Sequence, residues 1–343
     1  MKILVTGGTG YIGSHTVVEL QKQGYEVIVV DNLSNSYENV LDNIAEITGT
    51  RPEFEKFDLS ETQKTNQFFD RHRDIKGIIH FAAFKAVGES VERPLMYYHN
   101  NLVSLINLLS NMVRYKIANI VFSSSCTVYG QPDELPVSEN APVKSAWSPY
   151  GNTKQIAEEI IYDTLQGCRD LKGIALRYFN PIGAHDSAKI GELPLGVPNN
   201  LVPFITQTAI GIRQQLKVFG DDYNTHDGTA IRDYIHVVDL AKAHVTAVDR
   251  MLNDKNKKAF EVFNLGTGNG YSVMDVIKSF ERVSGEKLNY KVVDRRPGDV
   301  EKVWADTTFA NHELGWKAER GLDDMMRTAW QWQKALEKKQ GLK

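Results

Sequence analysis

The sequence predicts an α/β protein in which a doubly wound parallel sheet is followed by a smaller mixed α/β lobe. Over the first half of the chain, short apolar segments alternate with longer amphipathic ones, a pattern typical of strands that helices cover on both faces. A glycine-rich segment directly follows the first apolar one. Prolines and glycines cluster after residue 179, where the alternation ends. Together these observations favour an open parallel sheet that holds a ligand at its carboxyl edge.

The expected strands of the first half are short and mostly apolar. In chain order they are residues 2–6, 26–31, 53–57, 77–81, 119–123 and 173–178. Apolar residues at helical spacing predict helices at 12–22, 102–115 and 150–165. Beyond residue 180 we expect helices at 201–212, 237–251 and 323–338, and strands at 216–219 and 261–265. Residues 1–180 and 181–343 are therefore predicted to form two domains, with some later segments returning to the first.

The composition disfavours several classes of function. The chain has 343 residues, of which 42% are hydrophobic and 24% charged, and its formal net charge is −3. No long basic segment is present, so nucleic acid is not an expected partner, whereas a few placed arginines suffice for an anionic small ligand. The two cysteines, Cys126 and Cys168, are far apart, which disfavours a disulfide framework and a zinc site. No segment has the pattern of a signal peptide or a membrane span. We expect a cytoplasmic protein that binds neither a metal nor a membrane.

The glycine-rich segment has the spacing of a dinucleotide-binding loop. Gly7, Gly8, Gly10 and Gly13 fit both G-x-G-x-x-G and G-x-x-G-x-x-G, between an expected strand and an expected helix. Glycines let backbone amides approach a pyrophosphate, and the helix N-terminus adds unpaired N–H groups. Alone, such a segment is equally typical of an ordinary turn, so its interpretation depends on the residues at the end of the next strand.

Asp31 ends the second expected strand, roughly 20 residues further on, where a carboxylate accepts both hydroxyls of an adenosine ribose. Asn32 is the next residue, and no Arg or Lys stands beside it to compensate a ribose phosphate. The pattern therefore predicts a Rossmann-type domain that binds NAD rather than NADP. Asp58 and Leu59 come after the third strand and are candidates for contact with the adenine, although Asp58 is as typical of a helix cap.

Three residues predict hydride chemistry on an alcohol. Ser125 comes just after the fifth expected strand, and Tyr150 and Lys154 share one helix face at i and i+4. Lowering the pKa of a phenol from about 10 by roughly 3 units requires about 4 kcal/mol, which a cation supplies only in a partly buried site. With Lys154 and a positive nicotinamide ring nearby, Tyr150 can take a proton from the substrate hydroxyl that Ser125 holds. Lys154 would also hold the nicotinamide ribose.

The glycine loop, Ser125 and the Tyr150-x-x-x-Lys154 pair resemble the extended short-chain dehydrogenase/reductase family. Within it, the chain is similar along essentially its whole length to the UDP-glucose (UDP-galactose) 4-epimerases. The matching segments are T-G-G-T-G-Y-I-G-S-H at 6–15, I-H-F-A-A at 79–83, K-A-V-G-E-S at 85–90, R-Y-F-N-P at 177–181, P-N-N-L at 198–201 and R-D-Y-I-H-V at 232–237. The resemblance implies an NAD-binding domain at 1–180 and a UDP-sugar-binding lobe at 181–343.

The resemblance also implies roles for individual residues. Contacts with NAD are implied for Gly7, Gly10, Tyr11, Ile12, Gly13, Asp31, Asn32, Asn35, Asp58, Leu59, Phe81, Ala82, Lys85, Asn100, Tyr150, Lys154 and Phe179. Contacts with the UDP-sugar are implied for Ser125, Tyr150, Asn180, Asn200, Leu201, Val218, Phe219, Arg232, Arg296, Asp299 and Val303. Arg232 and Arg296 suit a diphosphate because a guanidinium donates in a fork, although a solvated surface arginine has the same appearance in a sequence.

The reaction implied by the family is a reversible inversion at sugar C4. Hydride moves to NAD, the resulting 4-keto sugar turns over within the site, and hydride returns to the opposite face, while UDP stays anchored and NAD is retained. Two positions depart from the common family pattern. Cys126 stands where Ala is frequent, and a small buried thiol is expected there. Val303 stands where some bacterial members restricted to glucose and galactose carry Tyr, so we expect UDP-GlcNAc and UDP-GalNAc to be accepted as well.

Two other functions and the oligomeric state stay open on the sequence. A nucleotide-sugar 4,6-dehydratase shares the Tyr/Lys pair but needs an acid and a base after the catalytic Ser, where Cys126 and Thr127 stand here. A non-catalytic NAD(H)-sensing protein would usually lose Tyr150 and Lys154, which are both present. The family is typically a homodimer joined through two helices of each subunit, and the apolar faces of 102–115 and 150–165 are compatible with that.

Overall fold

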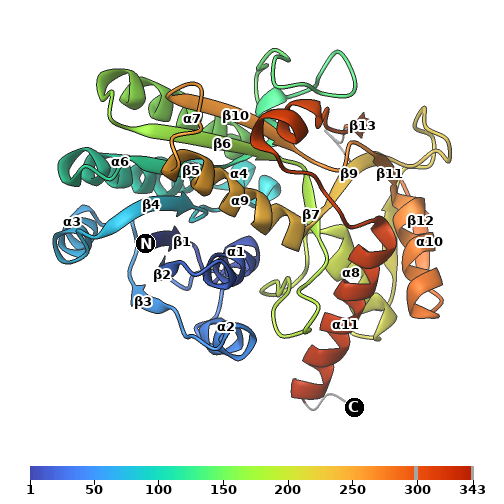
Figure 1. Cartoon of the computed structure of the whole chain (residues 1–343). Coiled ribbons are helices and arrows are strands. Elements are labelled where there is room, and N and C mark those ends of the chain that lie inside the picture. The colour runs from blue at the N-terminus through green and yellow to red at the C-terminus, as the bar shows by residue number, and fades with distance from the viewer. Residues whose placement is uncertain (297–299, 341–343) are drawn as a thin grey trace.

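A seven-stranded parallel sheet lies at the centre of the computed structural model, which describes residues 1–296 and 300–340 (Figure 1). The strand order is β10-β6-β5-β4-β1-β2-β3. The strands are β1 (Lys2–Thr6), β2 (Glu26–Asp31), β3 (Glu53–Lys56), β4 (Ile75–His80), β5 (Asn119–Ser125), β6 (Lys172–Tyr178) and β10 (Phe260–Leu265). The order reverses between β1 and β4, the point at which doubly wound sheets bind ligands. The predicted fold class is confirmed.

Helices cover both faces of the sheet. Successive side chains of a strand point to opposite faces, and apolar side chains of the central strands are buried on both faces. Ile3 and Val5 of β1 belong to one core with α1 (Tyr11–Lys22), α2 (Val40–Thr48) and α9 (Val237–Leu252). Leu4, between them, belongs to a second core with α3 (Thr62–Arg71), α6 (Ser104–Tyr115) and α7 (Pro149–Gly167). Each fully buried aliphatic side chain contributes about 1.5–3 kcal/mol, so these cores fix the sheet and its carboxyl edge.

The chain returns to the large sheet after it has entered the smaller lobe. β10 pairs in parallel with β6, from Phe260 beside Gly173 to Leu265 beside Tyr178. α9 packs against α1 and against β4, β5 and β6. Two elements that come after residue 181 in the chain therefore belong to the Rossmann-type half of the molecule.

The smaller lobe is built around two short sheets. In one, β9 (Ile231–His236) pairs with β7 (Asn180–Ile182), β11 (Gly270–Ser272) and β13 (Lys302–Val303). In the other, β8 (Leu216–Phe219) pairs with β12 (Tyr290–Val293). The helices are α8 (Leu201–Ala209), α10 (Val273–Ser284) and α11 (Leu322–Gln340), and α11 packs beside both of the others (Figure 1). Phe280, Met325 and Trp330 lie in the core that these elements enclose.

Some elements differ from expectation. The helix expected at 102–115 begins later, as α6, and is preceded by α4 (Val87–Glu92), α5 (Pro94–Tyr98) and a π-helical turn, η1 (His99–Val103). The helix expected at 201–212 ends at Ala209. Two further short helical segments are η2 (Cys126–Tyr129) and η3 (Ala310–Leu314). Over residues 1–296 and 300–340, no helix has the length and apolar character that crossing a membrane requires.

Candidate active site

The glycine loop between β1 and α1 brings backbone close to backbone. Gly7 has a φ of +70°, a backbone conformation that residues with a side chain rarely adopt. A Cβ on Gly7 would lie 2.8 Å from the amide nitrogen of Ala82. A Cβ on Gly13 would lie 2.2 Å from the carbonyl oxygen of Gly7. α1 begins at Tyr11, and Gly10 before it provides no side-chain cap for the first helical N–H groups. The loop therefore fits a pyrophosphate, which needs close, uncapped amides.

Asp31 lies beside this loop, at the carboxyl end of β2. Its carboxylate accepts hydrogen bonds from the backbone N–H of Thr9 at 3.3 Å and of Leu33 at 2.9 Å. Asn32 donates its side-chain amide to the Asp58 carboxylate at 2.9 Å. These contacts connect the glycine loop with the segments after β2 and β3, where the adenosine half of NAD is expected. The uncompensated Asp31 charge disfavours a phosphate on the ribose.

The remaining residues implied in NAD binding are spread around this edge. Phe81 and Ala82 come directly after β4, the neighbour of β1 in the sheet, and Ala82 faces Gly7 closely. Asn100 lies in the π-helical turn η1, and Asn35 is exposed in the loop after β2. The structure thus brings Phe81 and Ala82 to the glycine loop and places Asn35 at the surface.

Four of the implied residues serve packing or lobe contacts. Leu59 is 4% exposed in one core, and Ile12 packs against the other. The Tyr11 hydroxyl donates to the carbonyl oxygen of Gly183 at 2.6 Å, which joins α1 to the segment after β7. Lys85 lies 3.8 Å from the Glu192 carboxylate. The N-terminal half therefore touches the smaller lobe next to the glycine loop.

Ser125, Tyr150 and Lys154 converge at the carboxyl end of β5. Ser125 is the last residue of β5 and is 7% exposed, and α7 carries the other two residues on adjacent turns. The Lys154 ammonium donates to the carbonyl oxygen of Ser123 at 2.7 Å and lies 5.9 Å from the centroid of the Tyr150 ring. Ser148 caps α7, accepting from the Gly151 N–H at 3.1 Å.

Burial dominates the electrostatics of these groups. It raises the pKa of the Tyr150 phenol above its usual value, with a smaller contribution from Tyr178, and a hydrogen bond with Ser125 acts in the opposite direction. Burial also lowers the pKa of Lys154 to about 8 and raises the pKa of Cys126 to about 12. Cys126 is thus a protonated, packed thiol. Lys154 alone does not make Tyr150 a base, because the desolvation of the phenolate outweighs its attraction.

The substrate side of the site comes from β9, β13 and β8. Val303 of β13 and Arg232 of β9 are paired in register. Phe179, 3% exposed, lies in a small core against which Val303 packs. The Arg296 guanidinium lies 4.6 Å above the Phe219 ring. The structure therefore pairs Arg232 with the position that we connect with substrate breadth, and it places Arg296 against an aromatic face.

The other implied substrate residues are more dispersed. Asn180 is exposed at the start of β7, and Val218 is 1% exposed inside β8. Asn200 stands at the N-cap position of α8, before Leu201, but its side chain donates to the Glu192 carboxylate at 2.6 Å instead of capping the helix. Val218 is thus a core residue. Asp299 lies outside the described residues.

Sequence reasoning missed two carboxylates. Glu192 contacts both Lys85 and Asn200, one from each implied ligand site. Glu158, one turn beyond Lys154 on α7, forms a buried ion pair with Arg177 of β6. The i, i+4, i+8 spacing from Tyr150 was a signal for Glu158. No sequence signal for Glu192 stands out. Lys85 lies more than a hundred residues before it in the chain, and Asn200 lies eight residues after it.

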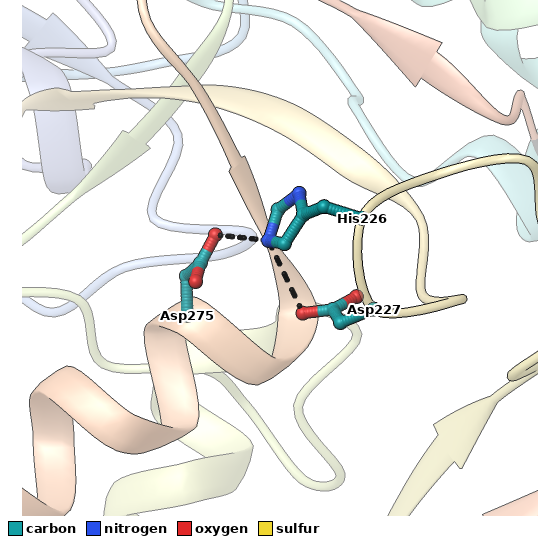
Figure 2. Close-up of side chains that lie close together, drawn as sticks. All are labelled: His226, Asp227 and Asp275. Carbon is teal, nitrogen blue, oxygen red and sulfur yellow. Dashed lines mark ion pairs between the residues drawn. The ribbon is translucent and has the colours of Figure 1, made fainter.

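Among the described residues, one cluster has a composition that can hold a metal: His226, Asp227 and Asp275 (Figure 2). The His226 Nε2 atom lies 3.4 Å from Asp227 and 3.2 Å from Asp275. However, both carboxylates already accept hydrogen bonds from Ser272, at the N-cap of α10. The helix N-terminus carries a partial positive charge, so we assign the cluster to capping of α10.

Known proteins match this chain over nearly its whole length. A UDP-glucose 4-epimerase from Bacillus subtilis is 51% identical over 333 residues, 97% of this chain and 97% of the relative. This chain belongs to the UDP-glucose 4-epimerase family. A Drosophila melanogaster UDP-glucose 4-epimerase is 50% identical over 337 residues, 96% of each chain. The crystal structure of an epimerase from Stenotrophomonas maltophila with bound NAD and formylated UDP-arabinopyranose has a TM-score of 0.95, 47% identity and 99% coverage of both chains.

Family membership confirms the predicted family, the enzyme class and NAD as the cofactor. The wider family that matches residues 4–329 is described as GDP-mannose 4,6 dehydratase, the alternative considered from the sequence. The two epimerase relatives are about half identical to this chain, and no carboxylate comes directly after Ser125, where Cys126 and Thr127 stand. Both observations favour the epimerase.

Proposed function

We propose a mechanism by which this chain performs the reaction of its family, the reversible C4 epimerisation of UDP-hexoses such as UDP-glucose and UDP-galactose. The observation that carries the proposal is the position of Ser125, Tyr150 and Lys154 at the same sheet edge as the glycine loop and Asp31. NAD, when bound, accepts a hydride from C4 of the sugar and returns it. The glycine loop and Asp31 would hold its pyrophosphate and adenosine.

Tyr150 is proposed to remove the proton of the 4-hydroxyl group and to return it after the sugar has turned over. Its pKa is raised by burial, so its deprotonation needs positive charge beyond that of Lys154, and the oxidised nicotinamide is the group of the right sign. Lys154 is held in place by its hydrogen bond to the Ser123 carbonyl. Ser125 would hold the same substrate oxygen and relay the proton.

The smaller lobe is proposed to hold UDP while the hexose stays loosely bound. Arg232 and Arg296 suit the diphosphate because a guanidinium binds phosphate oxygens with two parallel N–H groups. The Phe219 ring, beneath Arg296, offers an apolar face for the uracil. Inversion requires tight binding of UDP and loose binding of the hexose, because the 4-keto sugar must turn to present its opposite face without leaving the site.

A product assay tests this function. Purified protein is incubated with UDP-glucose or UDP-galactose, without added NAD, and the nucleotide sugars are separated. We expect both incubations to reach the same ratio, because the reaction is reversible and the cofactor is regenerated. A 4-keto-6-deoxy product would support the dehydratase instead. Bound NAD without any turnover would support the NAD(H)-sensing alternative.

We further propose that UDP-GlcNAc and UDP-GalNAc are substrates. Val303 is paired with Arg232 and packs beside Phe179, so its size bears directly on the space next to the sugar. A Tyr there would add a phenol ring where Val has an isopropyl group. Val303→Tyr is expected to abolish turnover of the acetylated pair while keeping UDP-galactose turnover, and Val303→Ala serves as the control. Undetectable wild-type turnover of UDP-GalNAc, beside strong UDP-galactose activity, would disprove this proposal.

We also propose a cytoplasmic homodimer that is joined through α6 and α7. Ile106 and Val113, seven residues apart on α6, are 46% and 43% exposed, and Tyr162 on α7 is 49% exposed. An apolar face of this kind is typical of a subunit interface. Light scattering of the wild type and of Ile106→Glu tests the dimer, since the substitution should convert a dimer into a monomer.

The cytoplasmic location is supported by the unpaired Cys126 and Cys168, which are typical of a reducing compartment.

A further inference from the structure

Behind the catalytic residues, the buried Glu158 carboxylate has three hydrogen-bond donors. Oε1 accepts from the Ser124 hydroxyl at 2.5 Å and from Arg177 Nε at 2.9 Å, and Oε2 accepts from Arg177 Nη2 at 2.5 Å. The side chains of Arg177 and Glu158 are 8% and 9% exposed. Ser124 and Arg177 are paired in register on neighbouring strands. One carboxylate therefore joins α7, β5 and β6.

The side chains of α7 hold β5 at the two residues that precede Ser125. The Lys154 ammonium binds the Ser123 carbonyl, and the Glu158 carboxylate binds the Ser124 hydroxyl. Tyr150, Lys154 and Glu158 are spaced by four residues and so lie in one row along α7. These two contacts therefore connect the row of side chains that begins at Tyr150 to the strand that ends at Ser125.

We propose that Glu158 is a positioning residue, which fixes Tyr150 and Lys154 on α7 relative to Ser125 on β5. The inference rests on the catalytic roles proposed above and adds to them a residue that touches neither substrate nor cofactor. A buried carboxylate with a bidentate Arg partner suits this task, because it has little freedom and is costly to leave unpaired.

Glu158 also supplies a negative charge one turn from Lys154. Its carboxylate raises the pKa of Lys154, against the larger effect of burial, which lowers it to about 8. Among the described residues, Tyr150 on α7 and His80 on β4 also interact with this ammonium, and Arg177 on β6 is paired with the same carboxylate. His80 is itself kept neutral, since burial lowers its pKa to about 3. Removal of the Glu158 charge should therefore make Lys154 lose its proton at lower pH.

The chain contains a matched control for the cost of breaking such a pair. Arg250 on α9 donates through Nε at 2.7 Å and Nη2 at 2.9 Å to Glu261 on β10. Their side chains are 9% and 7% exposed, close to the values of the first pair. α9, which carries Arg250, packs on the opposite face of the sheet from α7, and so does Phe263, two residues from Glu261 on β10. Glu261→Gln therefore reports what breaking a buried Arg–Glu pair costs the structure, without any change next to Tyr150 and Lys154.

The experiment measures kcat and KM for UDP-galactose from pH 6 to pH 10 in the NAD-bound enzyme. Glu158→Gln is expected to lower kcat by about 10- to 100-fold, because small misplacements of reacting groups are costly, with little change in KM. It should also move the alkaline limb of the kcat profile toward lower pH by about one unit. Ser124→Ala keeps the charge and should lower kcat without moving that limb. Glu261→Gln should change neither.

Two outcomes overturn separate claims. An inactive Tyr150→Phe, together with Glu158→Gln that matches Glu261→Gln in kcat and in pH profile, overturns this inference alone. Near wild-type turnover of Tyr150→Phe overturns the catalytic assignment and this inference with it. Should Glu158→Gln fail to fold, Ser124→Ala decides, since an unchanged kcat in that variant overturns the positioning role.

Discussion

Gly13→Ala is the sharpest probe of the nucleotide end of the site. Gly13 lies inside α1, where a Cβ would come within 2.2 Å of the Gly7 carbonyl oxygen and 2.9 Å of the Gly8 Cα. Both contacts are with backbone atoms, so no side chain can rotate away. The glycine loop and α1 must separate by about 1.2 Å to reach an ordinary contact of 3.4 Å.

The expected magnitude is set by that displacement. Overpacking of this kind costs about 1–3 kcal/mol, and the higher helix propensity of Ala offsets up to about 1 kcal/mol of it. A shift of about 1 Å also removes one or two amide–phosphate hydrogen bonds. Each charge-assisted bond contributes about 1.5–3 kcal/mol, so NAD affinity should fall by at least about tenfold.

The assay measures the NAD that stays with the protein after desalting, and the free energy of unfolding in urea. Gly167→Ala is the control, because Gly167 is the last residue of α7 and a Cβ there meets nothing within 4 Å. We expect the control to be as stable as the wild type or slightly more stable, and to retain NAD. If Gly13→Ala behaved like Gly167→Ala in both measurements, the packing argument for the glycine loop would be wrong.

Three further outcomes test other parts of the site. Tyr150→Phe should lower kcat by about 10²–10⁴-fold without loss of bound NAD, and turnover close to wild type would contradict its role. Asp31→Ala should weaken NAD retention and reduce the preference for NAD over NADP, measured by titration of the apoprotein; an unchanged preference would contradict the ribose contact. Because burial lowers the pKa of His80 to about 3, the unfolded state binds an extra proton as the pH falls below about 6.5. The free energy of unfolding should therefore drop between pH 7.5 and 5.5 by about 1.4 kcal/mol for this residue, and His80→Gln should remove that part of the drop in urea titrations.

Local patterns predicted many of the elements because their signals lie within short segments. The range of β2, Glu26–Asp31, and that of β8, Leu216–Phe219, agree with expectation. β2 is a continuous apolar run, which forms a strand when both faces of the sheet are covered, whereas β8 contains the exposed Lys217 between two buried residues. One helix was missed although its signal was present. Ser272 and Asp275 form a capping box at the start of α10, and the S-x-x-D spacing is visible in the sequence.

The sequence by itself determined the fold class and the choice of NAD and predicted roles for Ser125, Tyr150 and Lys154, because each of these inferences depends on residue type and short-range spacing. Tertiary structure decided what depends on distant segments. β10 joins the first sheet beside β6, Val303 is paired with Arg232, and Glu158 forms its ion pair with Arg177. Periodicity carries no information on which segments become neighbours. The raised pKa of Tyr150 is likewise a result of folding, because its largest cause is burial and desolvation is a property of the surroundings and not of the residue.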